Sequence, residues 1–155
     1  MTLLSNRRLA GIVLCAALVS GLLVTGRTAL AADCETVWLP VYDLEVEVGR
    51  DVYHFGDTAR VDVTVTHTDT GTAVEDASVL AYVPYFENDG FVAGWDRTDA
   101  SGHAVAYLEL KRKHLRPGPT KLRVIGMKTT SDPTTCVQVV EYGEVRLRKA
   151  FTVKP

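Results

Sequence analysis

The feature that most constrains the fold is a two-residue alternation of apolar and polar side chains. In residues 44–48 leucine and valine alternate with glutamate, and in residues 61–66 valine alternates with aspartate and threonine. Ala104, Ala106, Leu108 and Leu110 occupy every second position of a later segment. Successive side chains of a β-strand point to opposite faces, so this period is typical of strands that bury one face.

Turn-forming residues separate these segments, for example Asp69-Thr70-Gly71 and Pro117-Gly118-Pro119. No stretch of ten or more residues has a convincing helical period. We therefore predict an all-β fold, an immunoglobulin-like antiparallel β-sandwich of about seven strands. The strands are expected at residues 36–48 (interrupted near Pro40), 59–67, 77–83, 91–95, 103–110, 121–128, 136–142 and 145–153.

The N-terminal residues have the layout of a bacterial secretory signal peptide. Arg7 and Arg8 precede an uncharged, mostly apolar segment, and small residues precede Ala32. We expect residues 1–31 to be a signal peptide and residues 32–155 to form one domain. That domain would be secreted or associated with the cell surface, with no membrane contact after cleavage. A retained membrane anchor is the alternative, because the apolar segment is close to the shortest length that spans a bilayer.

Cys34 and Cys136 are the cysteines that remain once the N-terminal segment, with Cys15, is removed. Two cysteines in an exported domain predict a disulfide bond between Cys34 and Cys136. Two unpaired thiols are the alternative. A zinc site is disfavoured, because neither a histidine nor a second cysteine lies beside Cys34.

Several short motifs lie between residues 50 and 155. The segment YHFGDTA covers residues 53–59, TDASGHA covers residues 98–104, and the chain closes with FTV at residues 151–153. These segments resemble bacterial immunoglobulin-like modules of the macroglobulin and invasin types, although Phe55 stands where the family has proline. The resemblance supports the predicted sandwich in a single copy. It implies adhesion or surface display as the function.

Charge is divided unevenly between the two halves of the mature sequence. Residues 33–99 contain 15 acidic and three basic residues, whereas residues 100–155 contain 11 basic and four acidic residues. We expect neighbouring strands to neutralise each other. A basic patch at residues 111–116 is the alternative, but 14 basic against 19 acidic residues after residue 31 disfavour a nucleic-acid partner.

Asp99, Ser101 and His103 are the three residue types of a hydrolase triad. At the start of a strand, Ser101 and His103 would hold their Cβ atoms about 7 Å apart, and such a cluster cannot supply a triad and its oxyanion donors. We therefore expect a turn that leads into a strand, no enzyme activity and no cofactor. Calcium binding by Asp96, Asp99 and Ser101 stays open, although Gly102 is misplaced for an EF-hand loop.

The most informative segment for function is residues 82–95, where aromatic residues gather around an Asn-Asp-Gly turn. Clustered aromatic side chains are typical of binding surfaces. Burial of Phe91, Trp95 or a tyrosine in the sandwich core is the alternative. The candidate ligand surface consists of Tyr85, Phe86, Phe91 and Trp95.

These patterns favour an exported, non-catalytic immunoglobulin-like module that binds a protein or a glycan at the cell surface or in the extracellular space. A structural accessory domain of a larger surface assembly is the first alternative. A small secreted hydrolase is the second, and it is disfavoured because no nucleophile, base and glycine-rich turn cluster together in the sequence.

Overall fold

The computed structural model describes residues 35–84, 91–132 and 134–155. All described residues belong to one compact unit, Ala32–Pro155. The described residues contain strands and no helix. In chain order the strands are β1 (Glu35–Pro40), β2 (Tyr42–Val48), β3 (Val52–His54), β4 (Thr58–His67), β5 (Ser78–Pro84), β6 (Phe91–Arg97), β7 (His103–Glu109), β8 (Gly118–Asp132) and β9 (Val137–Lys154).

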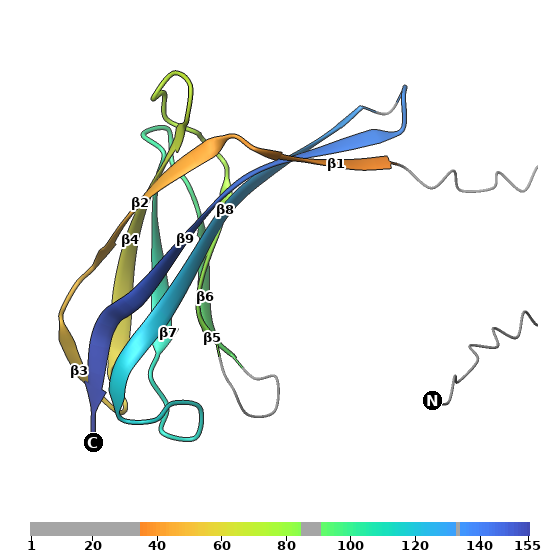
Figure 1. The fold of residues 1–155 in the computed structure, drawn as a ribbon. Helices are drawn as coiled ribbons and strands as arrows, with labels where there is room; N and C mark the ends of the chain where they lie inside the picture. The colour runs from red at the N-terminus through yellow and green to blue at the C-terminus, as the bar shows by residue number, and fades with distance from the viewer. Residues whose placement is uncertain (1–34, 85–90, 133) are drawn as a thin grey trace, which may run out of the picture. The chain divides into compact units, whose positions relative to one another are not determined.

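The strands form two sheets that pack face to face (Figure 1). The large sheet has the order β1-β9-β8-β5-β6, with β3 also paired to β9, and the small sheet has the order β2-β4-β7. The predicted immunoglobulin-like β-sandwich is therefore confirmed. Two pairings are parallel, since β1 and β3 both run parallel to β9, while the other paired strands are antiparallel.

The hydrophobic core follows from the two-residue alternation. Val61, Val63 and Val65 of β4 are fully buried, whereas the residues between them are partly exposed. The predicted inward positions at residues 104–110 are buried as well. Val79 and Ala81 of β5 and Val124 of β8 face them from the large sheet. Each sheet therefore contributes one apolar face to a shared core.

The predicted break near Pro40 is confirmed, and it transfers the chain from one sheet to the other. β1 ends at Pro40 and β2 begins at Tyr42. Between them, Val41 donates its backbone N–H to Tyr142 of β9 at 3.0 Å, and its carbonyl accepts from Thr68 at 2.9 Å. One residue thus connects the edge of the large sheet to the small sheet.

The prediction of separate strands at residues 136–142 and 145–153 is wrong, because β9 runs without interruption across Gly143. Gly143 pairs with Gly126 of β8, and a Cβ atom at Gly143 would overlap the carbonyl oxygen of Tyr42. The glycine allows close passage of two backbones rather than a turn. The sequence prediction also missed β3, which has three residues.

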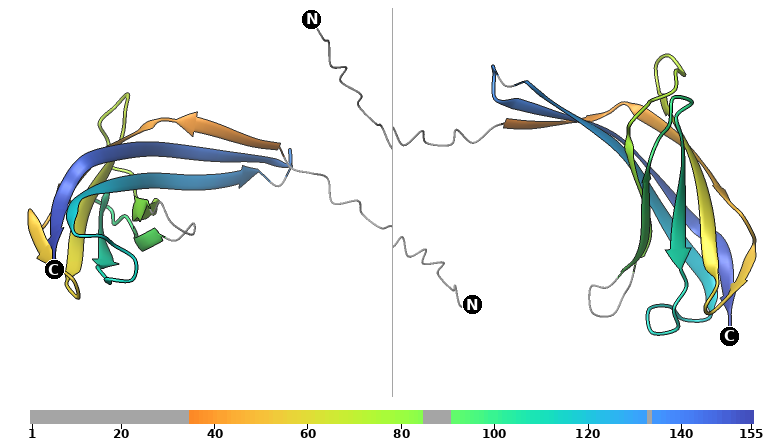
Figure 2. Two further views of the ribbon diagram at one scale, coloured as in Figure 1. Left: turned by 60° about the horizontal axis from the view of Figure 1, so that its bottom comes forward. Right: turned by 180° about the vertical axis from the view of Figure 1, so that it is seen from behind.

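β1 and the adjoining ends of β8 and β9 form an arm that continues beyond the small sheet (Figures 1 and 2). In this arm residues 35–40 pair with residues 137–142, which pair with residues 127–132 on their other side. The arm therefore consists of three strands without a second sheet against it. Within the described residues, no helix is long and apolar enough to cross a membrane.

Candidate functional site

The outer face of the large sheet has a row of apolar side chains on its central and edge strands. Leu80 of β5 is the direct partner of Trp95 on β6 and of Ile125 on β8. Directly opposite residues point to the same face, so the three side chains lie side by side. Trp95 is 75% exposed, and Leu80 and Ile125 are partly exposed. We call Trp95, Leu80 and Ile125 the outer row.

A second set of apolar side chains connects the outer row to the arm. Met127, two residues beyond Ile125 on the same strand, pairs with Tyr142 of β9. The Tyr142 ring meets the Trp38 ring of β1 edge to face, with centroids 5.9 Å apart. Trp38 is 58% exposed. Apolar side chains therefore cross the whole outer face from β6 to β1.

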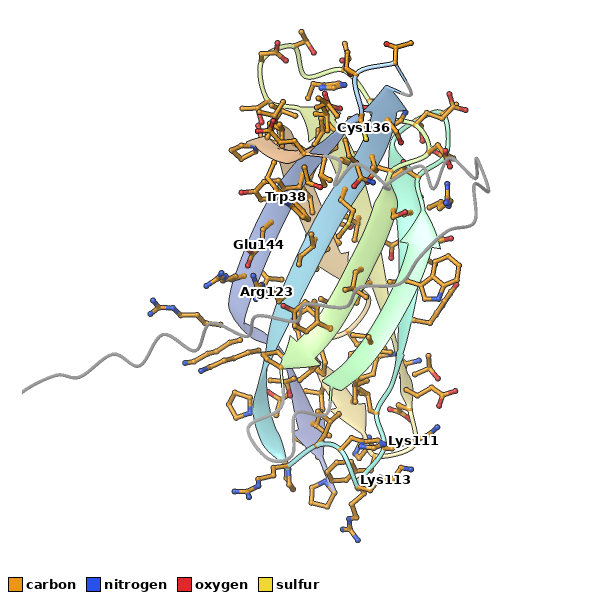
Figure 3. All side chains as sticks on the ribbon, turned by 90° about the vertical axis from the view of Figure 1, so that its right-hand side faces the viewer. Trp38, Lys111, Lys113, Arg123, Cys136 and Glu144 are labelled. Carbon is orange, nitrogen blue, oxygen red and sulfur yellow. The ribbon has the colours of Figure 1, made fainter. Side chains whose placement is uncertain are left out.

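A cluster of charged side chains borders the outer row on β8 and β9. Arg123 donates to the Glu144 carboxylate through Nε and through an Nη atom, the latter at 2.8 Å, and Arg146 donates to the same carboxylate. Figure 3 shows Arg123 and Glu144 side by side. The Arg123 guanidinium also lies 5.7 Å from the centre of the Tyr82 ring. An apolar row with a charged rim is the usual composition of a binding surface.

The hydrogen bonds from Arg123 and then from Arg146 lower the pKa of Glu144 from an ordinary value of 4.5 to about 2. The charged carboxylate is therefore favoured in the folded chain more than in the unfolded chain. Its contribution to stability is complete above pH 4.5 and is lost as the pH falls from about 4.5 to about 2.

Glu144→Gln is expected to remove this part of the acid sensitivity. The wild-type chain should be more stable than the variant by about 1 kcal/mol at pH 6, a small value because solvent screens partly exposed ion pairs. The difference should shrink towards zero as the pH approaches about 2. Urea unfolding from pH 6 to pH 2.5 measures it, and a difference that stays constant with pH would contradict the assignment.

The edge between β6 and β7 closes one side of the sandwich. A Cβ atom at Gly94 of β6 would overlap the backbone of Tyr107 on β7, so only glycine permits this approach. The Asp96 carboxylate accepts from the backbone N–H of Val105 at 3.0 Å. The Tyr107 side chain is 58% exposed. Trp95 and Tyr107 therefore lie on neighbouring strands at this edge.

The structure describes only part of the predicted ligand surface. Trp95 is exposed, so the alternative that placed its ring in the core is wrong. Phe91 begins β6 opposite Pro84, and its side chain is outside the described part of the structure. Tyr85 and Phe86 lie outside the described residues. Sequence reasoning missed Leu80, Ile125, Met127 and Tyr107 as surface residues.

The predicted turn at Asp99, Ser101 and His103 has the hydrogen bonds of a strand entry. The Asp99 carboxylate accepts from the Ser101 hydroxyl at 2.6 Å and from the backbone N–H groups of Ser101 and His103. These bonds lower the pKa of Asp99, the Ser101 hydroxyl most of all. The His103 ring lies instead 3.3 Å from Asp62. The side chains of the serine and the histidine therefore have different carboxylate partners.

The oxygen atoms proposed for calcium also have other partners. Asp96 accepts from Val105 across the β6–β7 edge, and Asp99 accepts within its own turn. In the described ranges, no group of three His, Cys, Asp or Glu side chains is arranged to hold a metal ion. The calcium alternative thus gains no support from the geometry.

The basic segment at residues 111–116 lies at the end of the sandwich opposite Cys136 (Figure 3). Lys111 pairs with Glu109, and the Arg112 guanidinium lies 5.5 Å from the centre of the Phe55 ring. A pocket of about 280 Å³ opens beside this segment. Pro84, the last residue of β5, lines the pocket. In the sequence it directly precedes Tyr85 of the predicted ligand surface.

The register of β1 and β9 bears on the predicted disulfide. Glu35 pairs with Val137, and these residues directly follow Cys34 and Cys136. Cys136 has a positive φ of 53°, at the point where the chain enters β9. Cys34 lies outside the described residues, so the bond stays a prediction.

Comparison with known proteins identifies no family. No protein-family model and no curated protein matches the chain. Among solved structures, the crystal structure of MtrC from Shewanella baltica OS185 is similar over 73% of this chain, with a TM-score of 0.35 and 16% identity. The chain spans 23% of the length of that protein. This likeness assigns neither a family nor a function.

Proposed function

We propose that the protein is an exported, non-catalytic immunoglobulin-like module that binds a partner through the outer row of its large sheet. The observation that carries the proposal is the exposure of Trp95 beside Leu80 and Ile125. A monomeric domain without a ligand gains nothing from an indole that is 75% exposed, whereas tryptophan is among the residues that contribute most to binding.

The partner is a protein or a glycan of the cell surface or the extracellular space. Aliphatic side chains beside the indole, with the charged rim at Arg123 and Glu144, favour a protein. Export follows from the signal-peptide layout of residues 1–31, and a disulfide between Cys34 and Cys136 suits that compartment. The resemblance to bacterial immunoglobulin-like modules supports the same assignment.

A structural accessory domain within a surface assembly is the second candidate. The three-stranded arm favours it, because Trp38 and Leu39 of the arm are 58% and 39% exposed. Such a domain would bind nothing through Trp95 when it is isolated.

Trp95→Ala is expected to weaken binding to the envelope fraction of the source cells by about 30-fold or more, because truncation of a central tryptophan typically costs about 2 kcal/mol or more. Trp38→Ala is the matched control, since it removes the other tryptophan of the chain. Co-sedimentation of labelled full-length chain measures both. Equal binding by wild type and Trp95→Ala would reject this face.

Treatment of the envelope fraction separates the two partner classes. If protease treatment abolishes binding and periodate oxidation does not, the partner is a protein. If periodate oxidation abolishes binding and protease treatment does not, the partner is a glycan. A double variant with alanine in place of Tyr85 and Phe86 tests whether these two residues belong to the same binding surface as Trp95.

A further inference from the structure

β1 is an edge strand whose outer side has no partner among the described strands. It pairs with β9, and the sheet order places it at the end of the large sheet. It belongs to the arm, where the small sheet does not reach (Figures 1 and 2). An edge of this kind offers backbone donors and acceptors to another strand.

The direction of these backbone groups follows from one hydrogen bond. Val41 donates its N–H to Tyr142 of β9 at 3.0 Å. Backbone groups of alternate residues in a strand point to the same side, so residues 37 and 39 also direct theirs towards β9. The backbone groups of Thr36 and Trp38, and the carbonyl of Pro40, therefore point away from β9.

The outer edges of β2 and β6 are protected. On β2, exposed Asp43, Glu45 and Glu47 stand at every second position. β6 faces β7, with Asp96 bonded to Val105 and Gly94 against Tyr107. Charged side chains and coverage by a neighbouring strand are the usual means of preventing strand addition.

β1 has neither a covering strand on its outer side among the described residues nor a row of charged side chains. Its sequence is ETVWLP, with a single charge at Glu35 and the apolar run Val37, Trp38 and Leu39 in the middle. Trp38 and Leu39 are both substantially exposed, and neighbours along a strand point to opposite faces. Both faces of this edge therefore present apolar surface for a second strand.

We propose that two copies of this chain pair antiparallel through β1, about a two-fold axis at Trp38. Antiparallel pairing separates the two Glu35 carboxylates to opposite ends, whereas parallel pairing would place them side by side. A two-fold axis perpendicular to the sheet also makes the interface self-complementary and closed. This inference does not rest on the proposed function of the outer row.

Centring on Trp38 sets the register. Each Trp38 then donates to the carbonyl of Trp38 in the second copy, and each Thr36 donates to the Pro40 carbonyl. Val37 lies opposite Leu39 of the second copy, so apolar side chains meet. Centring on Val37 would instead place Glu35 against Leu39, a carboxylate against an apolar side chain.

The test is sedimentation velocity of the full chain, purified after export by an expression host, from about 5 to about 500 µM. A six-residue edge makes a small interface, so the expected dimer is weak and concentration-dependent. Thr36→Pro removes an outward N–H and keeps the backbone bonds to β9, although it also removes the 3.4 Å hydrogen bond from the Thr36 hydroxyl to Gln138. Trp38→Lys places two ammonium groups opposite each other. Each variant should raise the dissociation constant at least about 10-fold.

Thr129→Lys is the matched control, because Thr129 is exposed in the same arm but lies on β8, two strands away from the β1 edge. It should dimerise like wild type. Unchanged thermal unfolding of the variants shows that they are folded. A wild-type chain that is monomeric throughout, or a dimer that both variants leave intact, would overturn the proposal.

Discussion

Gly143→Ala is expected to destabilise the fold by about 3 kcal/mol, because an alanine methyl group cannot fit between two backbones. A Cβ atom at this position would overlap both the Tyr42 carbonyl oxygen and the Leu44 side chain. The backbone cannot easily move, since Tyr142 accepts from Val41 and Gly143 pairs with Gly126. The loss would be a large part of the stability of a typical domain.

Gly49→Ala is the matched control for this prediction. A Cβ atom at Gly49 would meet its nearest neighbour, the Tyr53 hydroxyl, at an ordinary 3.5 Å. Urea unfolding followed by circular dichroism should show a change within about 1 kcal/mol for Gly49→Ala. If Gly143→Ala is as stable as the control, β9 does not cross Tyr42 as described.

Cys136→Ser is expected to lower the unfolding free energy by about 2–4 kcal/mol. The predicted bond to Cys34 would close a loop of about 100 residues and so restrict the unfolded chain. Glu35 pairs with Val137, and each of these residues directly follows a cysteine in the sequence, which suits such a bond. Cys34→Ser should have the same effect as Cys136→Ser, and the double variant should add nothing further.

Intact mass gives an independent measure of the same bond. The exported chain should be two hydrogens lighter than its sequence predicts, and reduction should restore them. An exported chain that reacts with two equivalents of a thiol reagent when unfolded would contradict the disulfide.

The parts of the fold that the sequence predicts are those governed by strict alternation. In residues 61–66 every second residue is valine, and these side chains are buried as expected. The break at Pro40 was predictable because proline cannot continue a sheet ladder. The uninterrupted β9 was not, since a glycine in a strand signals either a turn or a close approach, and local sequence does not distinguish them.

The candidate site was predictable only in part. Trp95 belonged to the predicted surface, but whether its ring faced the core or solvent depended on strand register. Leu80 and Ile125 were missed, although residues 79–83 are apolar at both odd and even positions. A strand that is apolar at every position has two apolar faces. In a sandwich one face of each sheet packs on the core, so the other apolar face of such a strand is exposed. Which strands adjoin it depends on long-range pairing that no local pattern gives.

The most direct test of the proposed binding face is a fluorine NMR measurement on the full chain labelled with 5-fluorotryptophan. The sequence has two tryptophans, so Trp38→Phe and Trp95→Phe assign both resonances. Unlabelled envelope material contributes no signal. Trp38 serves as an internal reference on the arm, and its resonance should depend on protein concentration if β1 forms the proposed dimer.

Addition of the envelope fraction at constant protein concentration is expected to shift or broaden the Trp95 resonance and to leave Trp38 unchanged. Of the periodate-treated and the protease-treated fractions, only one should still shift or broaden the Trp95 resonance. If the chain binds the envelope while the Trp95 resonance stays unchanged, the outer row is not the binding face.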